Sequence, residues 1–363
     1  MLISLKSPGI YMQKKDAIKE LYTYVSPFGS SALILISPSG YKRHSEDIRN
    51  GLNKDGFQCE FRQIGGECCQ QNIDAIIESI CDHAPSMIIS VGGGKILDTG
   101  KSVADALNLS CINIPTVAST DAPCSALAVL YTPEGIFDKY IHPKRCPDVV
   151  LVDTRIIADA PSKYLSFGIG DALSTYFEAR AVKASGSPNQ LGTQPTAAAF
   201  ALAKGCYETL MEYGKQAYED AKKHEVSFAL ERVVEANTYL SGVGFESGGV
   251  ACAHALQKGV TVIPKLHKKA HGEIVAFNTI VQLCLEKIPE AELRMIIEFC
   301  RSVDLPTKFE DLCDEPITRQ EWMAAAEFTC RPGMTIHKMP FEVTPQQLVD
   351  AIYEADRISS AIK

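Results

Sequence analysis

Residues 87–98 read Met-Ile-Ile-Ser-Val-Gly-Gly-Gly-Lys-Ile-Leu-Asp, and this stretch is the strongest indication of the fold. The apolar run 87–91 suits a buried strand, and residues 95–107 have helical periodicity. Three consecutive glycines therefore fall at a turn from strand to helix. Without Cβ atoms the backbone can approach a pyrophosphate closely, and the first amides of a helix bind anions. The stretch predicts a nucleotide-phosphate site to which Lys95 adds a positive charge, although a plain tight turn fits an isolated glycine triplet equally well.

The sequence around this turn predicts an α/β nucleotide-binding half. Short β-rich runs alternate with amphipathic segments through residue 150, as expected for a parallel sheet with crossover helices. Strands are predicted at 32–36, 58–63, 87–91, 111–114, 127–131 and 149–152, and helices between them at 44–54, 71–83 and 95–107.

From about residue 161 the predicted structure is helical. Long segments rich in alanine and leucine replace the strand signals, at 171–184, 195–213, 228–240, 272–285, 291–303 and 320–329. Turn and cap residues coincide near 159–163. A chain of 363 residues also exceeds the size at which one hydrophobic core usually stops growing. We therefore expect two domains, 1–160 and 161–363, with a ligand-binding cleft between them.

Composition excludes several classes of protein. With 46% hydrophobic and 22% charged residues, the sequence is typical of a globular protein, and it contains no apolar run long enough to span a bilayer. The net charge of −8 without a long basic block argues against nucleic acid as a partner. Thirteen cysteines, an odd number, indicate reduced thiols, and the N-terminus lacks a signal peptide. We expect a cytoplasmic protein without a membrane partner.

Three side chains of the second half are candidates for a metal site. His254 lies among small residues, where a buried imidazole needs a partner, and His271 opens a predicted helix, where the neutral form is favoured. Asp171 follows a glycine pair and precedes a predicted helix. Taken singly, His254 could be a hydrogen-bonded core histidine, His271 an exposed residue at a helix start, and Asp171 an ordinary N-cap. Together they supply one oxygen and two nitrogens, the ligand set of a catalytic zinc with open coordination positions.

The loop 115–125 carries polar side chains that could bind a cofactor. Thr116, Ser119 and Ser125 could bond its phosphate, ribose or carboxamide groups, although ordinary loop capping explains them nearly as well. Asp121 precedes Ala-Pro and could shape an Asx-turn or accept a hydrogen bond from a substrate hydroxyl.

Five segments in this order resemble the iron-containing alcohol dehydrogenase family. They are Val-Gly-Gly-Gly-Lys-Ile-Leu-Asp-Thr (91–99), Ile-Pro-Thr-Val-Ala-Ser-Thr-Asp-Ala-Pro-Cys-Ser-Ala-Leu (114–127), Gly-Ile-Gly-Asp-Ala-Leu (168–173), residues 230–249, and His-Gly-Glu-Ile-Val-Ala-Phe (271–277). The ending Thr-Ile-His-Lys-Met-Pro (335–340) also matches. The resemblance covers nearly the whole chain and is more specific than one glycine turn.

The resemblance implies a Rossmann-like first domain and a helical metal- and substrate-binding second domain, the dehydroquinate synthase-like fold. It implies reversible, metal-dependent oxidation of a polyol, such as glycerol to dihydroxyacetone, with hydride transfer to NAD. The metal, usually zinc but sometimes another divalent ion such as iron, is expected on Asp171, His254 and His271, which with Asp121 form the catalytic set. Family members form large homo-oligomers, often octamers. The expected cofactor contacts are Ser37, Gly93, Gly94, Lys95, Asp98, Thr116, Ser119, Ser125, Leu127 and Tyr131.

The chain departs from the family's pattern at two places. Ser37 stands where the family usually carries an aspartate facing the adenosine ribose, so that Ser37, Ser39, Lys42 and Arg43 could accept the 2′-phosphate of NADP. Ser37 could equally well weaken the binding of NAD without creating a preference for NADP. Gln257 and Lys258 replace a His-Asn pair of close relatives, which leaves the exact substrate open.

Other functions compete with this interpretation. A related oxidoreductase could act on a 2-hydroxy acid, an aldehyde or another diol. A glycerol 1-phosphate dehydrogenase would share the phosphate cradle and the metal site but would need cationic groups for the phosphate. A catalytically silent binding or scaffold protein is the alternative outside enzymes, and the presence of all three expected ligands argues against it.

Overall fold

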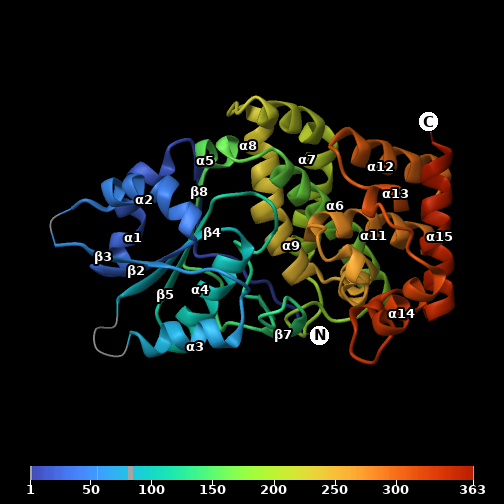
Figure 1. Ribbon diagram of the computed structural model, residues 1–363, viewed down its shortest axis with the longest axis horizontal. Helices are drawn as coiled ribbons and strands as arrows, with labels where there is room; N and C mark the ends of the chain where they lie inside the picture. Colours follow the sequence, from blue (N-terminus) through green and yellow to red (C-terminus); the bar gives the residue numbers. More distant parts are fainter. Residues whose placement is uncertain (1, 55, 81–84, 363) are drawn as a thin grey trace.

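The strands of this protein precede residue 154, and the elements that follow are helical (Figure 1). The computed structural model describes residues 2–54, 56–80 and 85–362. Six parallel strands form one sheet in the order β1-β8-β5-β4-β2-β3, and β6 pairs antiparallel with β7 in a separate ribbon. The strands are β1 (Ile10–Lys14), β2 (Ser31–Ile36), β3 (Gln58–Gln63), β4 (Met87–Gly92), β5 (Ser110–Pro115), β6 (Ala128–Tyr131), β7 (Phe137–Ile141) and β8 (Val149–Asp153).

Helices cover both faces of the sheet, because its central strands are apolar on both sides. Every residue of β4 is buried, with Ile89 packing on one face and Ile88 on the other. Such continuous apolar runs are typical of parallel strands between two helical layers. The helices of this half are η1 (Ala17–Glu20), α1 (Leu21–Val25), η2 (Ser26–Phe28), α2 (Pro38–Leu52), α3 (Gln70–Glu78), α4 (Gly94–Leu107) and α5 (Thr154–Asp159).

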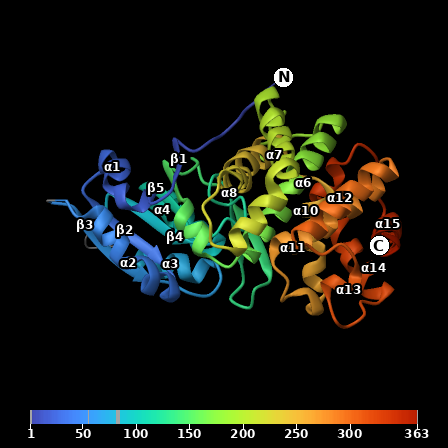
Figure 2. The same ribbon diagram turned by 90° about the horizontal axis from the view of Figure 1, so that it is seen from above.

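The second half is a bundle of helices lying beside the sheet (Figures 1 and 2). Its elements are α6 (Lys163–Ser185), α7 (Ala197–Lys222), α8 (Phe228–Glu235), the π-helix η3 (Ala236–Leu240), α9 (Ser241–Gly248), α10 (Cys252–Gly259), η4 (Val260–Val262), η5 (Pro264–Leu266), α11 (His271–Leu285), α12 (Glu290–Ser302), α13 (Phe309–Leu312), α14 (Arg319–Thr329), η6 (Thr335–Lys338) and α15 (Pro345–Ala361). No helix in the described ranges is both long and apolar enough to cross a bilayer.

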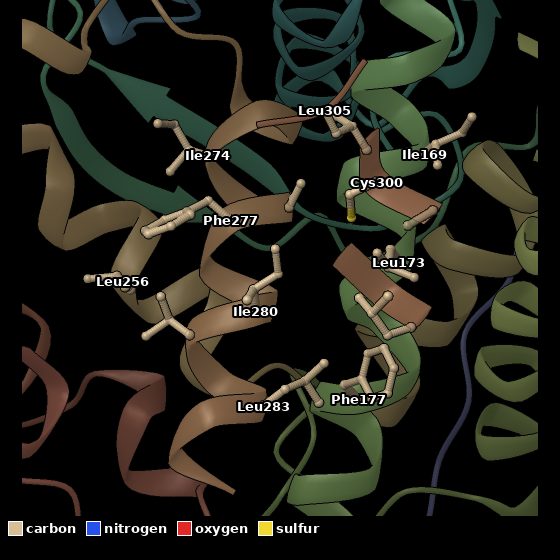
Figure 3. Packing of buried hydrophobic residues seen from close by; sticks show 14 of the residues in the cluster. Ile169, Leu173, Phe177, Leu256, Ile274, Phe277, Ile280, Leu283, Cys300 and Leu305 are labelled. Carbon is tan, nitrogen blue, oxygen red and sulfur yellow. The ribbon is translucent and has the colours of Figure 1, made fainter. Parts of the chain in front are cut away.

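Helices α6 and α11 form the centre of the bundle (Figure 3). On α6 the buried side chains Ile169, Leu173 and Phe177 recur every four residues and therefore share one face. On α11, Phe277 and Ile280 are three residues apart and face the same region. These two helices carry two of the three candidate metal ligands, so their packing fixes how far apart the ligands lie.

The predicted fold class is confirmed, and the boundaries of several elements differ. All six predicted strands are present, but β1 and β7 were not predicted, because both are short and largely polar or half-exposed. The helix predicted at 71–83 ends at Glu78, and residues 81–84 lie outside the described part. Helix α15 and the short helices α9 and α10 were also not predicted. The domain division at residue 160 stays a prediction, consistent with the change from strands to helices there.

Candidate metal and nucleotide site

Asp171, His254 and His271 come together from three helices. The Asp171 Oδ1 atom lies 3.1 Å from His271 Nε2 and 3.3 Å from His254 Nε2. One possible ligand atom from each residue lies within 4.8 Å of the others. Asp171 is only 1% exposed, whereas both histidines are partly open to a cavity. Two imidazole nitrogens and one carboxylate oxygen that converge in this way fit a divalent metal with coordination positions left for substrate.

Asp171 lies inside helix α6, and its interpretation as an N-cap was wrong. The helix begins at Lys163, eight residues before Asp171. The glycines at 168 and 170 are needed for close packing: a Cβ on Gly168 would lie 1.9 Å from the carbonyl oxygen of Ala118, and one on Gly170 would lie 2.3 Å from that of Gly272. The two glycines thus let α6 approach both the loop after β5 and the start of α11, which places Asp171 next to His271.

The two histidines each lie in the first turn of a helix. His271 is the first residue of α11, as the sequence predicted, and His254 is the third residue of α10. The chain reverses before α10 at Gly249, whose φ of 101° is in the left-handed region that favours glycine. The turn separates α9 from α10, and the first turn of α10 places His254 Nε2 3.3 Å from Asp171 Oδ1.

Glu178 holds the His254 ring from the side away from Asp171, and the sequence reasoning missed it. Its Oε2 atom lies 2.5 Å from His254 Nδ1, while its Oε1 accepts hydrogen bonds from the backbone N–H groups of Ala251 and His254. Glu178 follows Asp171 by seven residues, or two helical turns, so both carboxylates lie on one face of α6. A carboxylate on the second nitrogen of a ligand histidine fixes its tautomer and orientation.

The charges of this cluster shift its ionisation strongly. Burial alone would lower the pKa of His254, but the charge of Glu178 and hydrogen bonds to Asp171 and Glu178 outweigh it and raise the pKa well above its usual value. Burial would raise the pKa of Asp171, and the adjacent His271 and His254 instead hold it well below its usual range. The negative charges of Asp171 and Glu178 and the positive charge of a protonated His254 thus stabilise one another in this buried cluster.

Asp121 lies beside the cluster and does not form a local turn through its side chain. Its backbone N–H donates to Asp171 Oδ2 over 3.3 Å, and its own Oδ2 accepts a hydrogen bond from Ser241. The Asx-turn interpretation is therefore replaced by a long-range contact. Burial, and next the charge of Asp171, raise the pKa of Asp121 well above its usual value.

One groove joins the glycine turn to the metal-ligand cluster. It has an empty volume of about 1630 Å³, its open mouth included. Gly94 and Lys95 line it where α4 begins, and Asp171 and His271 line it at the other side. Four further predicted site residues lie along it: Asp98, Ser119, Asp121 and Tyr131. The structure thus places a candidate phosphate cradle and a candidate metal site in one continuous space.

Two of the three glycines in the turn, Gly93 and Gly94, have room for a side chain, whereas a Cβ on Gly92 would lie 2.8 Å from the Ile96 side chain. Gly93 precedes α4 in an extended conformation with a negative φ. A Cβ on Gly93 would meet its nearest neighbour, Val117, at 3.5 Å, and one on Gly94 would meet Thr120 at 3.4 Å, both near ordinary contact. Because the folded chain tolerates a side chain at both positions, the absence of side chains there suits a molecule that approaches the backbone.

Two predicted cofactor residues have protein partners. The Lys95 ammonium forms an ion pair with Glu67, another residue of the groove. Asp98 pairs with the buried Lys101 at 2.8 Å and accepts a hydrogen bond from the Val129 N–H at 3.0 Å. Lys101 also donates to the carbonyl of Ala122. Asp98 therefore supports the loop that carries Asp121. Neither Glu67 nor Lys101 was found from the sequence: Glu67 pairs with Lys95 from 28 residues away, and Lys101 reaches the carbonyl of Ala122 from 21 residues away.

The remaining predicted cofactor residues lie in different surroundings. Ser37 follows β2 and caps α2, its Oγ accepting a hydrogen bond from the Gly40 N–H at 3.0 Å. Leu127 and Tyr131 line a smaller cavity next to the metal-ligand cluster. Ser125 is 1% exposed, and the backbone N–H of Thr116 donates to Gly92. Ser37, Gly93, Thr116 and Ser125 do not line the groove itself in the described structure.

Comparisons with known proteins point to one family. The profile of the iron-containing alcohol dehydrogenases matches residues 8–154. The chain is 43% identical to a glycerol dehydrogenase of Pseudomonas putida over 98% of this chain and 97% of the relative, and 41% identical to one of Thermotoga maritima over 98% of each. The crystal structure of glycerol dehydrogenase from Schizosaccharomyces pombe superposes with a TM-score of 0.95 at 35% identity, covering 99% of this chain and 91% of that one. The protein is therefore an oxidoreductase that belongs to the iron-containing alcohol dehydrogenase family.

Proposed function

We propose that the protein oxidises glycerol or a similar vicinal diol to the corresponding hydroxyketone, reversibly, by transferring hydride to NAD. The observation that carries this proposal is the single groove that joins the glycine turn at Gly94 to Asp171 and His271. A dinucleotide lying along it would bring its nicotinamide from the phosphate cradle toward the metal-ligand cluster. The similarity to glycerol dehydrogenases over nearly the whole chain supports the choice of substrate.

We propose that zinc binds to Asp171, His254 and His271. Zinc readily takes imidazole nitrogens as ligands, whereas magnesium and calcium prefer sites made of oxygen atoms. A bound divalent ion would polarise a substrate hydroxyl and lower its pKa. Glu178 keeps the His254 ring oriented for this task. The buried position of Asp171 places its charge where water is largely excluded, which strengthens its electrostatic effect.

Asp121 is proposed to orient the substrate. It lines both the groove and the smaller cavity, and the hydrogen bond from Ser241 fixes its carboxyl group. Its raised pKa makes the carboxyl group able to donate as well as accept a hydrogen bond. A diol presents hydroxyls that can pair with either form, so Asp121 can hold one hydroxyl while the other faces the metal ligands.

NAD is the proposed cofactor, with NADP as a second substrate for the same site. Ser37 ends β2 at the position that would face the adenosine ribose, and its hydroxyl carries no charge that would repel a 2′-phosphate. Lys42 and Arg43 follow within the first two turns of α2, and neither side chain forms an ion pair within the described residues.

A matrix of substrates and cofactors tests this function. Purified protein is assayed with glycerol, 1,2-propanediol and glycerol 1-phosphate, each with NAD and NADP. The proposal expects oxidation of both diols and no oxidation of the phosphate ester, because the residues that line the cavity next to the metal ligands include a single lysine and no arginine, which could not balance a dianion fully. Preference for the phosphate ester, or no activity with either diol, would overturn it.

The proposal extends to the assembly of the subunits and to their place in the cell. We propose a homo-oligomer as large as an octamer in the cytoplasm, with the two domains 1–160 and 161–363 in each subunit. The twelve cysteines of the described residues are all free, which suits a reducing compartment. Light scattering coupled to gel filtration gives the subunit number, and a monomer would contradict the proposed assembly.

A further inference from the structure

Lys258 lies in the cavity beside the metal-ligand cluster although it is buried. It belongs to α10, one helical turn after His254, and is 7% exposed. The cavity that it lines is also lined by His254, His271 and Asp121. A lysine that is four residues from a candidate metal ligand shares the same helix face, with about 5–6 Å between the two Cβ atoms. Lys258 and two of the candidate metal ligands, His254 and His271, thus line one cavity.

No carboxylate of the described residues pairs with this ammonium group. The ammonium group lies over two aromatic rings: the Nζ atom lies 4.5 Å from the ring centre of Tyr140 and 5.8 Å from that of Phe137. The negative charge of Glu178 also acts on it, but both oxygens of Glu178 are bonded to His254 or to backbone N–H groups. A buried cation without an ionic partner is unfavourable, and aromatic faces compensate only part of the cost.

The surroundings of Lys258 make solvation an inadequate explanation. The rest of the cavity is lined by the apolar side chains of Leu127, Val129, Phe245 and Val250 and by the uncharged polar side chains of Tyr131, Gln190, Gln257 and Thr261, so none of these residues offers a counter-charge. Lys338, the other lysine whose charge acts on Lys258, is already bonded to Gln190 and to a backbone carbonyl. Burial accordingly lowers the pKa of Lys258 to about 8. An anion entering the cavity would restore the protonated form and gain a charge-assisted hydrogen bond.

A neutral diol leaves this cation unpaired, whereas a carboxylate matches it. One ammonium group balances the single charge of a carboxylate but only half of a phosphate dianion. Because Lys258, His254 and His271 line the same cavity, a molecule bound in it can present a hydroxyl to the metal ligands and a carboxylate to Lys258. Gln257, which lines the same cavity, adds an amide that can donate to the second carboxylate oxygen.

We propose that Lys258 forms a carboxylate subsite, so that the protein oxidises short hydroxy acids in addition to neutral diols. This proposal rests on the proposed function, because it uses the same metal ligands and cofactor. With lactate, hydride passes from C2 to the oxidised nicotinamide, the hydroxyl proton passes to solvent, and pyruvate and the reduced cofactor are formed. The carboxylate itself is unchanged and serves only to hold the substrate.

Lactate and 1,2-propanediol form a matched pair for the test, since they differ only in having a carboxylate or a hydroxymethyl group. The wild-type protein and the Lys258→Met and Lys258→Arg variants are assayed with both substrates, using each enantiomer. We expect Lys258→Met to lower kcat/KM for lactate by about tenfold more than for 1,2-propanediol, mainly through KM, because it removes a charge-assisted bond to the carboxylate. Lys258→Arg should recover much of the lactate activity.

Lys338→Met serves as the control, because it removes a nearby positive charge from outside the cavity. It should leave the ratio of the two kcat/KM values within about threefold of wild type, as expected for a charge that makes no contact with substrate. Equal losses of both activities in Lys258→Met, or oxidation of 1,2-propanediol without any oxidation of lactate by the wild type, would overturn the carboxylate subsite alone. Absence of all diol activity in the wild type would instead overturn the proposed function.

Discussion

Glu178 and His254 are joined by a 2.5 Å contact between Oε2 and Nδ1, and the same carboxylate binds the backbone N–H of His254. The ring is therefore fixed both through its side chain and through its own helix turn. Its other nitrogen, Nε2, is left to face Asp171. This arrangement makes the position of the ring a property of the folded chain, ready before a metal binds.

Replacing Glu178 by glutamine should weaken metal binding. Both oxygens of Glu178 accept hydrogen bonds, whereas glutamine has one oxygen and one NH₂ group. If this NH₂ group points at the imidazole N–H, two donors face each other and the preferred orientation of the ring is lost. We expect the affinity for zinc to fall by about 10- to 100-fold, the range typical of such outer partners. Titration of metal-free protein with zinc measures it. Glu208→Gln, which removes an exposed carboxylate from α7, is the control, and equal affinities in the two variants would contradict this role of Glu178.

Replacing Ser37 by aspartate should shift the cofactor preference toward NAD. Aspartate keeps the N-cap of α2 but adds a negative charge that repels a 2′-phosphate. The ratio of kcat/KM for NADP to that for NAD should fall by about tenfold or more. Ser37→Ala is the matched variant, since it removes the hydroxyl without adding charge and should change the ratio far less. An unchanged ratio in Ser37→Asp would place the adenosine ribose elsewhere.

Replacing Gly168 by alanine should destabilise the protein and displace Asp171. The new Cβ would lie 1.9 Å from the Ala118 carbonyl oxygen, so α6 would have to move. We expect a loss of about 1–3 kcal/mol or more in the free energy of unfolding, measured with urea, together with lower diol activity. Gly205→Ala on α7 has no atom within 4 Å of its Cβ and should instead gain about 0.5–1 kcal/mol. Equal stability of the two variants would contradict the close approach of α6.

Buried thiols should resist alkylation in the native protein. Burial raises the pKa of Cys111 and of Cys300 to about 12. At pH 8 only about one thiol in 10⁴ would then be ionised, and the reactive fraction should rise about tenfold for each pH unit. Mass spectrometry after iodoacetamide treatment should find the partly exposed Cys59 and Cys313 modified before Cys111 and Cys300. Equal labelling of Cys59 and Cys300 in native protein would contradict this difference in burial.

Local patterns in the sequence predicted six of the eight described strands and the three candidate ligands, because apolar runs and helix starts depend on neighbouring residues. The position of Asp171 within α6 could not be predicted in this way. It depends on contacts of Gly168 and Gly170 with Ala118 and Gly272, which lie far away in the chain.

Partners across the fold were missed for the same reason. Glu178 lies 76 residues from His254, and only its spacing of two helical turns from Asp171 could have indicated it. The ion pair of Lys95 with Glu67 likewise forms only when α4 packs beside the loop before α3.

Metal dependence tests most directly whether Asp171, His254 and His271 form a metal site used in diol oxidation. Protein freed of metal by a chelator is titrated with zinc while bound metal and glycerol-dependent reduction of NAD are measured on the same sample. Activity should return in proportion to metal and level off near one ion per chain, the stoichiometry of a single three-ligand site. The His254→Ala variant should bind no metal at this site and stay inactive while it remains folded. Full activity in metal-free protein, or normal metal content in His254→Ala, would contradict the proposed site.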